Sequence, residues 1–273
     1  MSLTFNAGSH RYRLDGRAVT GVTTLLGGGV PKPSLMGWYA RMVAEYVEAN
    51  PLEIERLRGE PTPTEKNPHG RSALVQALCK VPEGLRDSAG ERGTLIHDLG
   101  QRYLEGAEVV IPPLYEPEVM GLVTLIEALE LTPLIVEKSL ANRAHWYAGR
   151  VDFIGTSPYL NDGQPVLIDW KTSNGVYGET ALQAAAYAKA EFWVEDYDPH
   201  TEHPLPEITA TYVAHIRPGF TELHPLAESA EEIDAHFLQF QYAAEIARKA
   251  KDRAGYVKPA LNIEELTAAT LAA

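Results

Sequence analysis

Cysteine is almost absent from this sequence of 273 residues, which contains only Cys79. A single thiol excludes an intramolecular disulfide, a zinc site built from four cysteines and an iron–sulfur cluster held by four thiolates. Because free cysteines are among the most buried residue types, we expect Cys79 to be a buried and chemically inert side chain.

Long hydrophobic runs are missing too. No uninterrupted apolar run approaches the roughly 20 residues that a helix needs to cross a bilayer, so we expect no membrane span. Residues 1–6 have neither the basic segment nor the apolar segment of a secretory signal. These two absences predict a protein that stays in the cytoplasm.

Two further absences concern nucleotides and polyanions. The glycine run at 27–29 lacks a following Gly-Lys-Ser/Thr and no other Walker-type segment occurs, so we expect no ATP site and no ATP-driven motor. There is no basic excess, since the formal net charge is −13. Residues 1–110 contain 13 basic and 13 acidic side chains, whereas residues 111–273 contain 11 and 24. A polyanion should therefore meet the N-terminal half.

What is present in residues 1–130 predicts a β-hairpin followed by a helical lobe. The segment 9–19 alternates around Asp15-Gly16, a dipeptide typical of a two-residue hairpin turn. Residues 27–33, rich in glycine and proline, should break regular structure. Helical spacing and capping residues predict helices over 34–50, 72–80, 88–105 and 117–129, with an exposed loop over 51–70.

From residue 131 the pattern changes to short β-rich runs. We expect strands over 134–137, 146–155, 165–171, 208–216 and 220–226, with a turn at 161–163, an alanine-rich helix over 179–193 and a long helix that ends near Lys251. The fold class is therefore α/β, with a mixed central sheet flanked by helices. We expect one domain over 1–273, divided into the N-terminal hairpin and helical lobe (1–130), an αβββαβ-type core with a C-terminal helix (131–258) and a tail (259–273).

Acidic residues on two neighbouring strands are the first candidates for chemistry. Because side chains alternate along a strand, Asp169 and Lys171 should project from one face while Trp170 packs on the other. A hairpin with the preceding strand would bring Asp152 beside Asp169. Adjacent carboxylates repel unless a cation lies between them, and oxygen ligands favour Mg²⁺ or Mn²⁺. The alternatives are a surface ion pair for Asp169 and Lys171 and a turn residue for Asp152.

Three side chains on predicted helices are further candidates. His97 follows Gly93 by one helical turn, and a small residue there lets a backbone or a phosphate approach closely. A neutral imidazole beside two carboxylates would suit Mn²⁺. Gln183 and Tyr187 are four residues apart, so both point the same way. The alternatives are a hydrogen-bonded packing histidine, a half-buried amide and a tyrosine at the core edge.

In chain order these residues form the motifs Gly93-x-x-x-His97, Gly149-x-x-Asp152, Asp169-x-Lys171 and Gln183-x-x-x-Tyr187. The ordered set resembles the PD-(D/E)xK nuclease superfamily, and within it the RecB-like branch that includes phage exonucleases and the CRISPR-associated four-cysteine nucleases. The resemblance covers about residues 90–190 and implies a restriction-endonuclease-like core. This chain departs from the four-cysteine nucleases, because Cys79 alone cannot hold their iron–sulfur cluster.

The resemblance implies a role for each motif residue. His97, Asp152, Asp169 and the backbone carbonyl of Trp170 would bind Mg²⁺ or Mn²⁺, and Lys171 would orient or help to deprotonate the attacking water. Gln183 and Tyr187 would position the DNA backbone and Lys171. Glu137, at the end of the first predicted strand, resembles an acidic position often found there and is an auxiliary candidate.

The resemblance favours a metal-dependent DNA exonuclease, encoded by a phage and acting in recombination, repair or replication. Its expected partners are DNA with free ends or single strands, and a single-strand-annealing recombination protein. Candidate phosphate contacts come from the charge-balanced half: Arg41, Arg71, Arg86, Arg92 and Arg102. The alternatives are a structure-specific or single-strand endonuclease, a catalytically silent DNA-binding recombination partner, and a zinc protein that uses His200 and His203.

Overall fold

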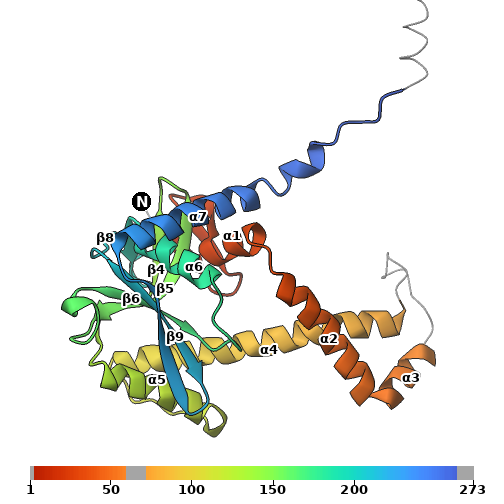
Figure 1. The fold of residues 1–273 in the computed structure, drawn as a ribbon, viewed down its shortest axis with the longest axis horizontal. Coiled ribbons are helices and arrows are strands. Elements are labelled where there is room, and N and C mark those ends of the chain that lie inside the picture. Colours follow the sequence, from red (N-terminus) through yellow and green to blue (C-terminus); the bar gives the residue numbers. More distant parts are fainter. Residues whose placement is uncertain (1–2, 60–71, 263–273) are drawn as a thin grey trace, which may run out of the picture.

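The computed structural model describes residues 3–59 and 72–262, and it confirms the mixed α/β class (Figure 1). Within these ranges ten strands form one sheet, and seven α-helices flank it. The strands are β1 (Leu3–Asn6), β2 (Arg11–Leu14), β3 (Arg17–Gly21), β4 (Thr132–Asn142), β5 (Tyr147–Thr156), β6 (Val166–Lys171), β7 (Phe192–Val194), β8 (His203–Pro204), β9 (Ala210–Arg217) and β10 (Phe220–Ala227). The helices are α1 (Val22–Gly29), α2 (Pro33–Ala49), α3 (Pro51–Gly59), α4 (Ala73–Leu104), α5 (Glu116–Ala128), α6 (Glu179–Ala188) and α7 (Ala230–Arg248).

Strand β5 is the branch point of the sheet. Along one edge it pairs antiparallel with β4. On its other edge it pairs parallel with β3 at Tyr147 and Ala148, and antiparallel with β6 from Phe153 to Gly155. Strand β6 then pairs parallel with β9, which pairs antiparallel with β10. Residues 149–152 therefore lie where the two arms of the sheet diverge.

Both predicted turns have the backbone that their residues suggest. Asp15 and Gly16 have φ values of 51° and 77°, which lets β2 and β3 form the expected hairpin. In the turn between β5 and β6, Asn161, Asp162 and Gly163 have φ values of 49°, 51° and 76°. Asparagine, aspartate and glycine tolerate this left-handed region better than other residues do. Turn chemistry thus sets the register of the strands on either side.

Each face of the sheet has its own core and its own helices (Figure 1). Helices α1, α6 and α7 cover one face, where Ala184, Ala185 and Ala186 of α6 are buried and keep the packing close. Helices α4 and α5 cover the other face, where Trp170 is buried. A Cβ on Gly100 of α4 would lie 2.7 Å from the Trp170 ring, so only glycine lets α4 come this near.

Several predicted boundaries are wrong in the N-terminal lobe. The predicted break over 27–33 is confined to residues 30–32, because the glycines at 27–29 belong to the last turn of α1. A Cβ on Gly29 would lie 2.0 Å from the Ala243 carbonyl oxygen of α7. The predicted loop over 51–70 begins with helix α3, and residues 60–71 lie outside the described residues. The two helices predicted over 72–80 and 88–105 are one helix, α4, which continues through the buried Pro82.

Two further expectations are corrected. Cys79 is exposed on α4 rather than buried. The helix predicted over 179–193 ends at Ala188, because Phe192 and Val194 leave it to form the buried side of β7. Of the predicted tail, residues 259–262 are described and have no regular structure, and the rest lies outside the described residues. None of the helices described is both long and apolar enough to span a bilayer.

Candidate metal centre

Three acidic residues lie in a row across β4, β5 and β6. Phe153 pairs with Val136 of β4 and with Ile168 of β6. The next position along each strand is acidic, so Asp152 lies between Glu137 and Asp169. The Oδ2 atom of Asp152 accepts a hydrogen bond of 2.7 Å from the backbone N–H of Trp170, which ties the end of β6 to β5. The row lies where the sheet branches, and its carboxylates meet partners on both α4 and α6.

Glu137 and Asp152 meet His97, which α4 presents to the sheet. Nδ1 of His97 lies 3.2 Å from Oε1 of Glu137 and 3.5 Å from Oδ1 of Asp152, and Nε2 lies 3.1 Å from the Trp170 carbonyl oxygen. The ligand atoms of His97, Glu137 and Asp152 all lie within 4.8 Å of one another. We call these three residues the sheet centre.

Charge within the sheet centre is balanced by a proton on His97. Burial opposes protonation of His97, but the carboxylates of Asp152 and Glu137 outweigh it and raise the pKa of His97 to about 10. Burial also opposes ionisation of Asp152, yet His97 and then Lys171 keep the pKa of this carboxyl below its usual value. Both ring nitrogens of His97 face oxygen atoms, as an imidazolium requires. Without a metal, the imidazole of His97 is thus the group that offsets the charge of these oxygens.

The donors of this site fit a hard divalent metal. They are one imidazole, the carboxylates of Glu137 and Asp152 and the carbonyl of Trp170. A set dominated by oxygen favours Mg²⁺ or Mn²⁺ over metals that prefer sulfur, and a single imidazole is compatible with Mn²⁺. A metal there would replace the positive charge that His97 now supplies.

Asp169 belongs to a second network, on the side of α6. Its Oδ2 lies 2.6 Å from Nζ of Lys171, and its Oδ1 accepts a hydrogen bond of 2.7 Å from Nε2 of Gln183. Gln183 also donates to the hydroxyl of Tyr187 at 3.3 Å and accepts from Lys171 at 3.4 Å. Burial and the Asp152 charge raise the pKa of Asp169 to about 6, against the opposing effect of Lys171.

The predicted ligand set is therefore brought together only in part. His97, Asp152 and the Trp170 carbonyl converge as the resemblance implies, and Glu137 completes the group in the place where Asp169 was expected. Tyr187 is only 3% exposed, so its hydroxyl supports the amide of Gln183 rather than reaching out of the site.

The motif glycines explain why these side chains meet. A Cβ on Gly149 would lie 2.4 Å from the Tyr187 ring, and a Cβ on Gly93 would lie 3.1 Å from Oγ1 of Thr172. Arg92 donates a hydrogen bond of 3.0 Å to the Thr172 carbonyl, which fixes α4 against the end of β6. Close approach at these two glycines places α4 and α6 on either side of the row of carboxylates.

The backbone of Glu137 is strained, and Arg150 holds its side chain. Glu137 has a φ of 50° in the middle of β4, a left-handed conformation that is costly for a residue with a side chain. Nε of Arg150 donates to Oε2 of Glu137 at 3.0 Å, and its other nitrogens donate to Asp196 at 3.0 and 3.1 Å. Sequence reasoning missed Arg150, whose one signal is its place inside the Gly149-x-x-Asp152 motif.

The sheet centre opens into a cleft of about 2310 Å³. Residues of α2 and α4 form one wall of this cleft, and residues of the sheet form the other. The cleft exceeds by far the roughly 300–1,000 Å³ of small-molecule sites, so it has room for a polymer. Arg41, Arg86 and Arg92 line it, as do the aromatic rings of Phe5 and Trp38. Two predicted phosphate contacts are not placed there. Arg102 is not among the lining side chains and pairs with Asp98 at 3.0 Å, and Arg71 lies outside the described residues.

The predicted zinc pair does not form a site. His203 stacks on Trp193 with ring centroids 4.5 Å apart, and among the described residues neither His200 nor His203 belongs to a group of three metal-ligating side chains. A scan of the chain against protein-family models finds no match, and a search of curated proteins finds none either. The geometry of the sheet centre and the sequence motifs are therefore what bear on function.

Proposed function

We propose that this protein is a divalent-metal-dependent deoxyribonuclease that hydrolyses phosphodiester bonds from DNA ends, of the PD-(D/E)xK type that its motifs resemble. One observation carries the proposal. The acidic row Glu137, Asp152 and Asp169 lies between a histidine on one side and a lysine on the other, at the base of a cleft that arginine side chains line. Paired carboxylates with a nearby lysine are what metal-assisted phosphoryl hydrolysis needs.

In this mechanism each side chain has a distinct task. His97, Glu137, Asp152 and the Trp170 carbonyl would hold Mg²⁺ or Mn²⁺, and Asp169 would join them if it exchanges Lys171 for the metal. The bound ion would supply Lewis acidity toward the phosphate and the attacking water. Glu137 keeps its position through Arg150, so this carboxylate needs little reorganisation when it takes up a ligand.

Lys171 acts as a hydrogen-bond donor rather than as a proton acceptor. Burial lowers the pKa of Lys171, but Asp169 and Asp152 outweigh this effect and raise it above the usual value. An ammonium has three N–H donors and no lone pair, so Nζ can orient a water or a phosphate oxygen but cannot take a proton. Gln183 limits the movement of Nζ through its contacts with both Lys171 and Asp169.

The side chains that line the cleft favour a single strand or a frayed end. Arginine side chains of α2 and α4 can contact phosphates, and the half-buried Trp38 and the Phe5 ring offer surfaces on which bases stack. Without an ATP-binding motif the protein cannot unwind a duplex actively, so a scissile phosphate inside an intact duplex should be out of reach. A phage enzyme of this kind would act in the host cytoplasm beside a single-strand-annealing protein.

Digestion of matched substrates tests the proposal. The full chain is incubated with end-labelled linear single strands, end-labelled linear duplex and covalently closed circular duplex, in Mg²⁺, in Mn²⁺ and in EDTA. We expect metal-dependent release of short products from the linear DNAs, fastest from single strands, with the closed circle spared. Asp152→Asn should be inactive, and Asp162→Asn, in the exposed turn between β5 and β6, is the matched control that keeps activity.

Three outcomes would count against this function. Rapid linearisation of the closed circle would favour the endonuclease alternative. Tight DNA binding with no cleavage in either metal would favour a silent recombination partner, against which the complete set of acidic, histidine and lysine side chains argues. Equal cleavage by Asp152→Asn and the wild type would show that the sheet centre is not the active site.

A further inference from the structure

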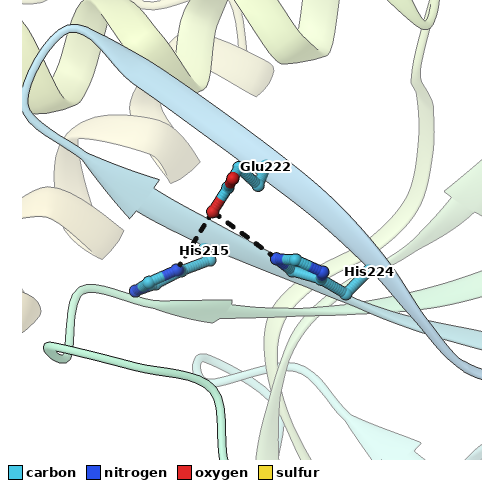
Figure 2. A group of neighbouring side chains, drawn as sticks. All are labelled: His215, Glu222 and His224. Atoms are coloured by element: carbon cyan, nitrogen blue, oxygen red, sulfur yellow. Dashed lines mark ion pairs between the residues drawn. The ribbon is translucent and has the colours of Figure 1, made fainter.

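A second group of metal-ligating side chains lies on the hairpin of β9 and β10 (Figure 2). His215 of β9 is directly opposite Glu222 of β10, and His224 follows Glu222 by two residues, so all three side chains lie on one face. One ligand atom from each lies within 4.8 Å of the others. We call these three residues the hairpin cluster.

The orientation of His215 is fixed by the chain beyond β6. Its Nε2 lies 2.8 Å from the carbonyl oxygen of Ser173, and a carbonyl can only accept, so Nε2 carries the hydrogen. This leaves Nδ1 facing Oε2 of Glu222. A histidine whose second nitrogen donates to a backbone carbonyl is the usual arrangement of a metal ligand, because that bond fixes the tautomer and the plane of the ring.

The distances between the ligand atoms of the cluster are those expected for ligands of one shared ion, and they are longer than hydrogen bonds. Oε2 of Glu222 lies 3.6 Å from Nδ1 of His215 and 3.6 Å from Nε2 of His224. Both distances are too long for a hydrogen bond. Two ligand atoms at about 2.1 Å from a tetrahedral ion would lie roughly 3.4 Å apart. Figure 2 shows the carboxylate directed between the two rings, as a shared ion would require.

We propose that the hairpin cluster binds a divalent transition ion of the zinc class through His215, Glu222 and His224. Two imidazoles and one carboxylate are typical ligands of Zn²⁺ and a poor set for Mg²⁺. The side chains of Glu222 and His224 are 52% and 45% exposed, so an ion can enter from solvent, whereas that of His215 is 6% exposed and anchors the site. A fourth position stays open to water or another ligand.

An ion bound at the hairpin cluster would lie near the sheet centre but would share no ligand with it. His215 is the register partner of Lys171 in the pairing of β6 with β9, and Ser173, whose carbonyl holds the His215 ring, lines the cleft. An occupied hairpin cluster would therefore hold the segment that follows Lys171 in place. This inference does not rest on the proposed nuclease function.

Cobalt titration of the full chain tests the inference, because four-coordinate Co²⁺ absorbs visible light and substitutes for Zn²⁺. We expect the wild type to give this absorption with saturation near one ion per chain, and added Zn²⁺ to remove it. His224→Ala and Glu222→Gln should each weaken binding by at least about tenfold, since each removes one ligand. Both side chains are half exposed, so circular dichroism should show both variants folded.

Two controls separate this site from others. His200→Ala removes an exposed histidine outside both groups and should bind cobalt like the wild type, and Asp152→Asn should leave the visible band in place. The proposal fails if the wild type shows no band, if His224→Ala and Glu222→Gln keep wild-type affinity, or if Asp152→Asn abolishes the band. Retention of the band in Asp152→Asn together with its loss in His224→Ala supports the proposal whether or not the protein cleaves DNA.

Discussion

The sheet centre and the hairpin cluster use the same types of side chain in opposite ways. The sheet centre draws His97 from a helix and its carboxylates from two strands, and it encloses them until Glu137 and Asp152 are each 8% exposed. The hairpin cluster takes all three side chains from two adjacent strands and leaves two of them half exposed. Oxygen atoms dominate the first and imidazole the second, so the two should select different ions.

The surroundings of the two groups also differ. Around the sheet centre a strained backbone at Glu137, the Arg150 clamp and two tight glycine contacts fix the geometry before any ligand arrives. At the hairpin cluster one backbone carbonyl fixes one ring. Preorganisation at this level is typical of a catalytic site. The hairpin cluster has three ligands and an exposed edge, so a metal bound there would keep one position open.

The largest expected difference is in DNA cleavage. Asp152→Asn should lower the rate by roughly 10³-fold, because several kcal/mol of transition-state stabilisation depend on the metal it helps to hold. Glu222→Gln should affect Mg²⁺-dependent cleavage far less. Initial rates on labelled single-stranded DNA measure both. Losses of similar size would mean that the two groups work as one site.

Lys171→Met should separate chemistry from metal binding. We expect cleavage to fall by about 10²-fold or more, as for other positioned donors and acids. Affinity for Mn²⁺, measured by calorimetry, should stay within a few-fold of the wild type, because an ammonium is not a ligand. Asp152→Asn is the matched variant that should lose both. A Lys171→Met protein that no longer binds Mn²⁺ would show that Lys171 is needed for the structure of the metal site and not for the hydrolytic step alone.

The stability of the metal-free protein should depend on pH through His97. The pKa of His97 in the folded chain, about 10, is above its ordinary value of 6.5, so its stabilisation is complete below about pH 6.5 and is lost as pH rises through about 10. We expect the wild type to lose about 2 to 4 kcal/mol more than His97→Gln over that interval. Urea denaturation in EDTA at several pH values measures the difference.

His224→Ala is the control for that measurement. It removes a half-exposed histidine and leaves His97 with its carboxylates in place, so the loss of stability that His97 causes as pH rises should remain. Parallel curves for the wild type and His97→Gln would contradict the charge balance assigned to the sheet centre.

The smallest expected effects come from one glycine in each region. Gly149→Ala should cost about 1 to 3 kcal/mol, because the new methyl group would overlap the Tyr187 ring and displace Gln183. Gly219 turns the hairpin of β9 and β10 with a φ of 85° and has open space around it, so Gly219→Asn should cost less than about 1 kcal/mol. Thermal melts of both variants measure the two losses of stability. A larger loss in Gly219→Asn than in Gly149→Ala would contradict the prediction.

Sequence reasoning succeeded where the local chemistry determines the geometry. The Asn161-Asp162-Gly163 turn sets the register that brings Asp152 opposite Asp169, and helical spacing places Gly93 and His97 on the face of α4 that meets the sheet. The roles assigned to these residues in metal binding and catalysis stay predictions, because the structure gives their positions and not their activity.

The rest depends on contacts between distant parts of the chain. Glycines 27–29 disfavour a helix locally, but α1 packs so closely on α7 that a Cβ would lie 3.0 Å from Ala247 at Gly28 and 2.0 Å from the Ala243 carbonyl oxygen at Gly29. Pro82 removes one helical hydrogen bond, yet its burial within α4 offsets that cost. The hairpin cluster was missed because His215 and Glu222 meet only through the register of β9 with β10.

The continuity of helix α4 limits which insertions and deletions this helix can accept. Its 32 residues form one continuous helix, from which Arg86, Arg92 and His97 all line the cleft. Each residue inserted between them would rotate one end against the other by about 100° and lengthen the helix by about 1.5 Å. Seven inserted residues would restore the rotation to within about 20°. Relatives of this protein should therefore lengthen or shorten α4 in steps of about two helical turns.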